Sequence, residues 1–166
     1  MTTVYLSLGS NINRKQNIAS ALNRLIELFG SIESSPIYES ESIGFDGDSF
    51  YNLVVRVKCD KSLSELSDCL KKIEDDNGRL RSGPRFSSRT LDIDIVIFGR
   101  KTGVYGGVEL PRPELYYNAF VLRPMADLAP LEIDPKSGET FETLWENIKS
   151  ELQSRQKLWQ IEFNDQ

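Results

Sequence analysis

Near the middle of the chain, a run of arginines is followed directly by two aspartates. The arginines have no acidic residue between them and stand at Arg79, Arg81, Arg85 and Arg89. Asp92 and Asp94 come next. Cations beside a pair of carboxylates are typical of a site for a polyphosphate and its metal ions.

The segment 91–98 predicts how these carboxylates are presented. Its period of two is typical of a strand, with both carboxylates on one face and the apolar residues Leu91, Ile93, Ile95 and Ile97 on the other. Two strand residues lie roughly 6.5 Å apart at their Cα atoms, so the carboxylates can share one or two hard cations, whereas on a helix they would diverge. We therefore expect the two carboxylates to bind a phosphate through magnesium.

A simpler interpretation is a solvated edge strand whose acids only discourage aggregation. The pattern places Val96 and Phe98 on the same face as the acids. Carboxylates on such an apolar strand are costly unless cations meet them, which favours the binding site.

Composition narrows the chemistry further. The 166 residues include no histidine, which disfavours Ser/His/Asp hydrolysis and histidine metal sites and favours phosphoryl transfer. The net charge of -5 argues against a nucleic-acid binder. Neither a P-loop nor a dinucleotide-binding glycine motif is present, so we expect side chains rather than a glycine-rich backbone loop to bind the phosphates.

Length and hydropathy bound the organisation of the chain. With no long apolar segment and no basic leader before an apolar block, we expect a soluble, cytoplasmic protein that contacts no membrane. We expect residues 1–166 to form a single domain that acts as a monomer.

The elements that must position the acids follow from periodicity and turn residues. Strands are predicted at 4–8, 31–38, 50–59 and 91–98, a hairpin turn at 103–107, and helices after 11, from 62 to about 78, at 119–128 and at 141–152. This order predicts an α+β fold with a ferredoxin-like βαββαβ core and additional C-terminal helices, a three-layer α/β sandwich.

Several short motifs carry a resemblance that covers nearly the whole chain. They are Leu8-Gly9-Ser10-Asn11, Phe50-Tyr51-Asn52, Gly78-Arg79-Leu80-Arg81, Arg89-Thr90-Leu91-Asp92-Ile93-Asp94-Ile95 and Ala119-Phe120-Val121-Leu122. With them the chain resembles the 6-hydroxymethyl-7,8-dihydropterin pyrophosphokinases of folate biosynthesis. The spacing between Arg89 and the two aspartates is the most specific element.

The resemblance implies transfer of the β,γ-diphosphoryl group of ATP to the hydroxymethyl oxygen of a reduced pterin, with release of AMP. Asp92 and Asp94 would hold two Mg²⁺ ions, and Arg79 and Arg89 would stabilise charge on the transferred group. The resemblance further assigns ATP contacts to Glu74, Arg81, Ile95 and Arg112.

The resemblance also implies a pterin pocket. The heterocycle would stack between Phe50 and Phe120, and Asn52 would form hydrogen bonds with the amide edge of the ring. Without the resemblance, these three residues would be read as core aromatics and a strand-end asparagine. The remaining implied contacts are Ser40, Ile43, Gly44 and Phe86, the last where the family usually has a larger aromatic.

Three departures from the family pattern leave an alternative open. Arg112 replaces a histidine between two prolines, Asn118 replaces an arginine, and Ser87-Ser88 replaces Gly-Pro. Arg112 keeps a donor and adds permanent charge, but no neighbour evidently compensates for Asn118. The alternative is a divergent paralogue that acts as a catalytically weak or silent pterin- or nucleotide-binding module. A ferredoxin-like RNA-binding domain is disfavoured by the paired acids.

Overall fold

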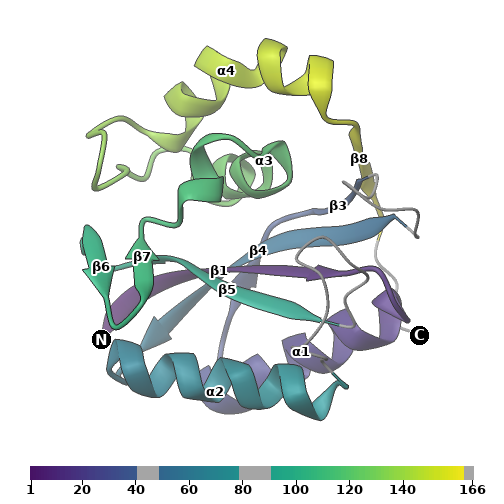
Figure 1. Ribbon diagram of the computed structural model, residues 1–166, viewed down its shortest axis with the longest axis vertical. Helices are drawn as coiled ribbons and strands as arrows, with labels where there is room; N and C mark the ends of the chain where they lie inside the picture. Colours follow the sequence, from purple (N-terminus) through teal and green to yellow (C-terminus); the bar gives the residue numbers. More distant parts are fainter. Residues whose placement is uncertain (41–48, 79–90, 163–166) are drawn as a thin grey trace.

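The structure is a computed structural model that describes residues 1–40, 49–78 and 91–162. These residues form a six-stranded sheet with the order β5-β1-β4-β3-β8, in which the short strand β2 also pairs with β4 (Figure 1). The strands are β1 (Thr2–Ser10), β2 (Glu33–Ser34), β3 (Ile37–Ser40), β4 (Phe50–Cys59), β5 (Asp92–Phe98) and β8 (Leu158–Ile161). Every pairing in this sheet is antiparallel.

Helices cover both faces of the sheet. The helices α1 (Arg14–Phe29) and α2 (Leu63–Asp76) lie on one side, and α3 (Ala119–Leu128) and α4 (Phe141–Arg155) lie on the other (Figure 1). The order β5-β1-β4-β3 with α1 and α2 on one face is that of a ferredoxin-like core. The predicted fold class, including the C-terminal helices as a third layer, is confirmed.

Local sequence explains where the first two helices begin and end. Gly30 ends α1 with a φ of 78°, which glycine adopts without strain, and its N–H donates to the Ile26 carbonyl. At the start of α2, Ser62 and Glu65 form the predicted capping box, in which each side chain accepts a hydrogen bond from the other's backbone N–H.

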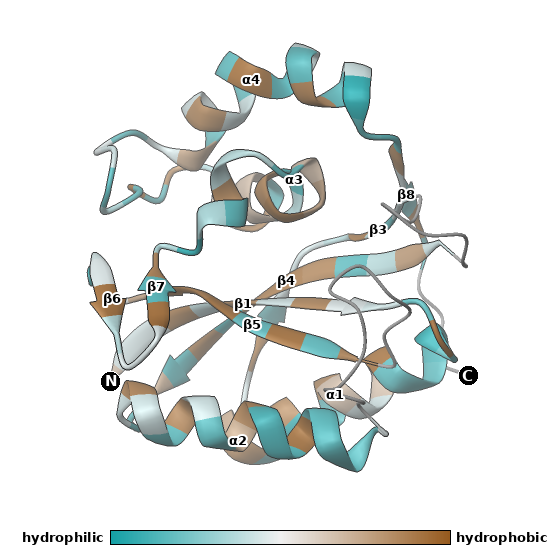
Figure 2. Cartoon of the chain, viewed as in Figure 1, coloured by the Kyte–Doolittle hydropathy of each residue, from teal (hydrophilic) through white to brown (hydrophobic). Residues whose placement is uncertain are grey.

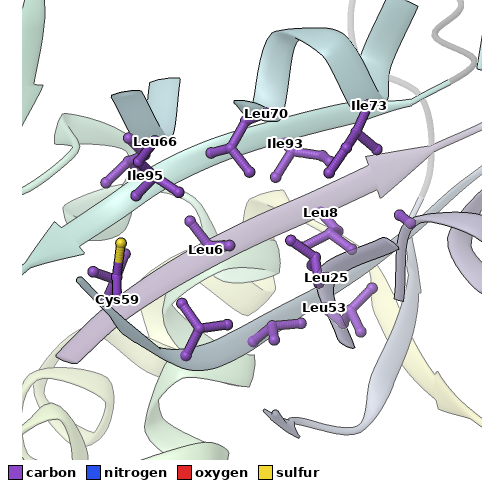
Figure 3. Packing of buried hydrophobic residues seen from close by; sticks show 14 of the residues in the cluster. Leu6, Leu8, Leu25, Leu53, Cys59, Leu66, Leu70, Ile73, Ile93 and Ile95 are labelled. Carbon is purple, nitrogen blue, oxygen red and sulfur yellow. The ribbon is translucent and has the colours of Figure 1, made fainter. Parts of the chain in front are cut away.

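Each face of the sheet has its own apolar core. On the α1 and α2 side, Leu6, Leu8, Leu53, Ile93 and Ile95 pack beneath Leu66, Leu70 and Ile73 of α2 (Figure 3). On the α3 and α4 side, Tyr5 and Val54 pack against Leu122 and Met125. In Figure 2, β5 is mostly hydrophobic but is interrupted by hydrophilic positions. None of the helices in the described part of the chain is long and apolar enough to cross a membrane.

The strand predictions needed three corrections. The second strand is divided into β2 and β3 by Ser35 and Pro36, because proline has no N–H to give to a ladder. Strand β8 was not predicted. In β5 the pairing with β1 shifts, so that Ile95 faces Leu6 and Ile97 faces Tyr5.

This shift is a β-bulge at Val96, and it inverts the alternation beyond it. Ile97 packs in the α3 core and Phe98 in the α1 and α2 core, so the prediction for these two residues was wrong. The alternation holds from Leu91 to Ile95, and therefore for both acids.

The outer edge of β5 is partly covered by the chain that follows it. After the hairpin of β6 (Gly103–Tyr105) and β7 (Val108–Leu110), the N–H of Arg112 donates to the Val96 carbonyl at 2.9 Å. A short 3-10 helix (Pro113–Tyr116) then leads into α3. This path brings Arg112 alongside the acidic end of β5.

Candidate functional site

Register places Asp92 and Asn52 in one row across the sheet, with Gly9 between them and Tyr38 next to Asn52. Asp92 of β5 lies opposite Gly9 of β1, Gly9 lies opposite Asn52 of β4, and Asn52 lies opposite Tyr38 of β3. Residues directly opposite each other in antiparallel strands project to the same face. That face is the one covered by α3, since Tyr38 donates a short hydrogen bond to Asp127 of α3. Two strand spacings put Asp92 and Asn52 about 10 Å apart.

Gly9 leaves the space that the Asn52 side chain occupies. A Cβ at position 9 would lie 3.1 Å from Asn52 Oδ1 and 3.9 Å from Phe50 Cδ1. The Asn52 amide in turn donates to Ser40 Oγ at 2.8 Å, and both residues are buried. Sequence reasoning did not assign Gly9 to the site, because the predicted strand ended at residue 8, whereas β1 extends to Ser10.

A cleft of about 420 Å³ follows the outer edge of β5. Its walls come from α2, β5, the end of the β6–β7 hairpin and the segment that begins at Arg112. Five predicted site residues line it together: Glu74, Asp92, Asp94, Ile95 and Arg112. The two carboxylates therefore face a common cleft.

Glu74 closes one end of this exposed strand edge. The residue is 6% exposed, and its Oε2 accepts a hydrogen bond from the Ile93 N–H at 2.8 Å. On an edge strand, alternate backbone groups point away from the sheet and need partners. Glu74 supplies one of these partners and fixes α2 against β5.

Arg112 lies beside the acidic pair. Its Nη2 is 2.6 Å from Glu114 Oε1 and 3.6 Å from Asp94 Oδ2. Burial lowers the pKa of Arg112, but the charges of Asp94, Glu114 and Asp92 outweigh it, so the net shift of this pKa is upward. The residue that replaces the usual histidine is thus a permanent cation next to Asp94.

The donor set of the cleft suits Mg²⁺ bound together with phosphate. In the part of the chain that is described, no group of three or more His, Cys, Asp or Glu residues could hold a metal ion. Asp92 and Asp94 supply carboxylate oxygens, and Asp94 keeps 36% of its side chain exposed. Mg²⁺ commonly takes one or two carboxylates and completes its octahedron with water and substrate phosphate oxygens. Two carboxylates on an open cleft fit that pattern.

The predicted pterin residues gather on the α3 side. Phe50 precedes Asn52 by two strand positions and so shares its face. Phe120, in the first turn of α3, packs at the margin of the core between α3 and the sheet. Ser40 lies beside Asn52 on β3. The structure thus brings these residues to the same side as Asp92.

The other predicted positions lie outside the described residues. They are Ile43, Gly44, Arg79, Arg81, Phe86 and Arg89, together with Arg85 and Ser87-Ser88. A larger cleft of about 780 Å³, between the start of α2 and the β6–β7 hairpin, is lined by none of the predicted site residues.

Comparison with known proteins agrees with the geometry. The family model for 7,8-dihydro-6-hydroxymethylpterin-pyrophosphokinase matches residues 5–130. The 2-amino-4-hydroxy-6-hydroxymethyldihydropteridine pyrophosphokinase of Pseudomonas aeruginosa is 36% identical over 76% of this chain and 80% of its own length. That of Bacillus subtilis is 30% identical over 82% of this chain and 84% of its own length.

Longer relatives match as well. A folic acid synthesis protein of Dictyostelium discoideum is 36% identical over 80% of this chain, and the chain spans 20% of that protein's length. The crystal structure of Plasmodium falciparum HPPK-DHPS wild type with SDX-DHP has a TM-score of 0.67 at 16% identity, covering 93% of this chain and 45% of the other. The chain therefore belongs to the 7,8-dihydro-6-hydroxymethylpterin-pyrophosphokinase family.

Proposed function

We propose that this protein transfers the β,γ-diphosphoryl group of ATP to the hydroxymethyl oxygen of 6-hydroxymethyl-7,8-dihydropterin, releasing AMP, as a step of folate biosynthesis. Family membership supports this activity. The observation that carries it is the row Asp92–Gly9–Asn52. Asp92, whose carboxylate would bind the metal ions of the phosphates, and Asn52, whose amide would hydrogen-bond the heterocycle, lie on one face of the sheet. Gly9 lies between them and has no side chain.

On the pterin side, the Asn52 carboxamide offers both a donor and an acceptor to the amide and amino edge of the ring. Its hydrogen bond to Ser40 fixes the orientation in which it does so. Phe50 and Phe120 would stack on the two faces of the heterocycle. Ile43, Gly44 and Phe86 belong to the same proposal through the family resemblance.

On the nucleotide side, Asp92 and Asp94 would hold Mg²⁺, and we propose two ions. Bound there, Mg²⁺ would neutralise phosphate charge and favour in-line geometry at the transferred group. Arg112 adds a cation to the same cleft from beside Asp94. Arg79, Arg81 and Arg89 are proposed to contact the phosphates, since they lie in the segment of the sequence between α2 and β5.

Ile95 and Glu74 would receive the nucleoside part of ATP. Because the Ile93 N–H points outward to Glu74, the backbone groups of Ile95, two residues further on, point to the same side. Ile95 lines the cleft, so its backbone can pair with the edge of a purine.

A few properties of the whole protein complete the proposal. We propose that residues 1–166 act as one monomeric domain in the cytoplasm, on small molecules rather than nucleic acid. Both cores of the described residues pack on the same sheet, which supports a single domain. The net charge of -5 supports small anionic substrates bound locally over a long phosphate backbone. Because the matching family and relatives are named as pyrophosphokinases, a catalytically silent module is not favoured.

The test is a product assay by ³¹P NMR with ATP, Mg²⁺ and 6-hydroxymethyl-7,8-dihydropterin. We expect AMP and the pterin diphosphate to form together, and only when all three components are present. Formation of ADP in place of AMP, or no turnover at all, would contradict the proposed reaction.

A further inference from the structure

We infer that Gln156 is a positioning residue of the pterin site, because its side chain holds the first turn of α3 and with it Phe120. Gln156 lies just after α4, far in sequence from every residue assigned to the site. The inference rests on the proposed function, since it concerns how one wall of the proposed pterin pocket is kept in place.

The Gln156 side chain contacts the start of α3 at three points. Its Oε1 accepts a hydrogen bond from the Ala119 N–H at 2.6 Å. Its Nε2 donates to the Tyr117 carbonyl at 3.0 Å and to Asn118 Oδ1 at 3.3 Å. A single amide side chain thus acts as the cap of this helix from a distant part of the chain.

The local sequence does not provide this cap itself. Asn118 is the N-cap residue of α3, yet its side chain accepts no hydrogen bond from the helix. Ala119 is fully buried, so water is poorly placed to satisfy its N–H if Gln156 is removed. Phe120 is the next residue, and its position therefore depends on this contact.

Gln156 also links α3 to the opposite wall of the pocket. It is followed within two residues by β8, which pairs with β3 and places Leu158 opposite Ser40. In Figure 1, β8 descends from α4 to the edge of the sheet at β3. Since Ser40 accepts the Asn52 hydrogen bond, the segment around Gln156 contacts both the helix that carries Phe120 and the strand beside Asn52. It is placed to set the spacing between them.

A run of polar contacts continues from this cap toward the nucleotide cleft. Asn118 Nδ2 donates to Glu114 Oε2 at 3.4 Å, and Glu114 holds Arg112, which in turn faces Asp94. Arg112 and Asn118, which are two of the departures from the family pattern, are therefore linked by this chain of polar contacts. Because Gln156 contacts α3 directly and Asp94 only through three other residues, its removal should affect pterin affinity more than nucleotide affinity.

The experiment compares the full chain with its Gln156→Ala variant. We expect the KM for the pterin to rise roughly tenfold, because a buried helix N–H loses its acceptor, while the KM for ATP and kcat change by less than about twofold. Calorimetric titration of the pterin in the presence of Mg²⁺ and a nonhydrolysable ATP analogue should give the same ratio. The matched control is Arg155→Ala, which removes only an exposed pair with Glu151 and should leave both constants unchanged.

The variant Gln156→Glu separates the two halves of the contact. It keeps an acceptor for the Ala119 N–H but turns its second oxygen toward the Tyr117 carbonyl, so only part of the pterin affinity should return. This variant also keeps the inference testable if Gln156→Ala fails to fold. Equal loss of pterin and nucleotide affinity in Gln156→Glu, or a fall in Tm alone, would overturn the positioning role.

Amide hydrogen exchange over residues 117–122 provides a readout that does not depend on turnover. We expect faster exchange there in Gln156→Ala and unchanged exchange in Arg155→Ala. Unchanged exchange in Gln156→Ala would overturn the inference. If the wild-type protein neither bound the pterin nor released AMP, the proposed function and the pterin role of Gln156 would both be overturned. Faster exchange over residues 117–122 in Gln156→Ala would in that case still show that Gln156 stabilises the start of α3.

Discussion

The two faces of the sheet differ in how far they are covered. The face beneath α1 and α2 is apolar from one end of the central strands to the other, with Leu6, Leu8 and Ile93 all in the core. The opposite face is apolar where α3 covers it, around Tyr5 and Val54, and then becomes polar at the row that contains Gly9. Both faces therefore contribute to stability. Chemistry becomes possible at the polar end of the α3 side, which we call the open face because Asp92 and Asp94 line the cleft there.

Neighbouring residues on one strand should consequently have separable effects. Leu8 and Gly9 are adjacent on β1, and Asp92 and Ile93 are adjacent on β5, yet each pair divides between the two faces. A change on the apolar face should alter the free energy of unfolding. A change on the open face should alter turnover or affinity.

The largest effect is expected from Asp92→Asn on the open face. Losing a carboxylate ligand should reduce kcat/KM by about a thousandfold, or roughly 4 kcal/mol of transition-state stabilisation. The Tm should stay close to that of the wild type, because Asp92 lines a cleft rather than the core. AMP release and calorimetric Mg²⁺-dependent nucleotide binding measure the first effect. Retained activity would show that Asp92 is not a ligand.

On the apolar face, Leu8→Ala should reduce the free energy of unfolding by about 3 kcal/mol through lost burial and a residual cavity. Leu8 is fully buried in the core beneath α1 and α2. Urea unfolding measures the loss, and the KM values of the folded fraction should be unchanged. A large rise in KM for either substrate would mean that the two faces are not separable.

Alkaline pH should weaken the attachment of α3 to the sheet. Burial, and then the hydrogen bond to Asp127, raise the pKa of Tyr38 from 10.0 to about 12. Below pH 10 the phenol is protonated in both states, so its contribution is complete. Between pH 10 and about 12 the unfolded state loses the proton first, and stability falls by an amount on the order of 2 kcal/mol. Urea midpoints for wild type and Tyr38→Phe should converge over this range, and a constant difference would contradict the assignment.

The smallest effect concerns the close approach of Asn52 to Gly9. In Gly9→Ala the new methyl group must displace Asn52 Oδ1 from 3.1 Å, which should shift the amide by a few tenths of an ångström. The expected result is a rise of about tenfold in the KM for the pterin, about 1.4 kcal/mol, with little change in the KM for ATP. Steady-state kinetics with each substrate varied in turn measure this. An equal change in both KM values would remove Gly9 from the pterin side.

Local sequence patterns were sufficient to predict most helices and strands, and to predict that Asp92 and Asp94 lie on the same face of β5. The capping box at Ser62 and the glycine after α1 act through neighbouring backbone groups, and period two holds through Asp92 and Asp94. The bulge at Val96 left no such signal. Its neighbours are all apolar, so a shift of one residue exchanges one buried side chain for another and leaves the hydropathy pattern unchanged.

The remaining features depend on contacts between distant segments. Strand β8 has four residues, two of them exposed, and its pairing with β3 joins positions far apart in the chain. Gln156 is a polar residue at a helix end until the fold brings it to Ala119. Gly9 was missed for a different reason, because the predicted strand ended at residue 8, whereas β1 continues to Ser10 and so includes Gly9.

The central claim is that Asp92 and Asp94 hold the metal ions of a nucleotide whose terminal phosphates point toward a pterin bound beside Asn52. A crystal containing Mn²⁺, a nonhydrolysable ATP analogue and 6-hydroxymethyl-7,8-dihydropterin tests it most directly through the anomalous signal of Mn²⁺. We predict Mn²⁺ in contact with both carboxylates and the pterin beside Asn52, with its hydroxymethyl group toward β1. Mn²⁺ bound away from both aspartates, or a pterin elsewhere on the molecule, would contradict the account.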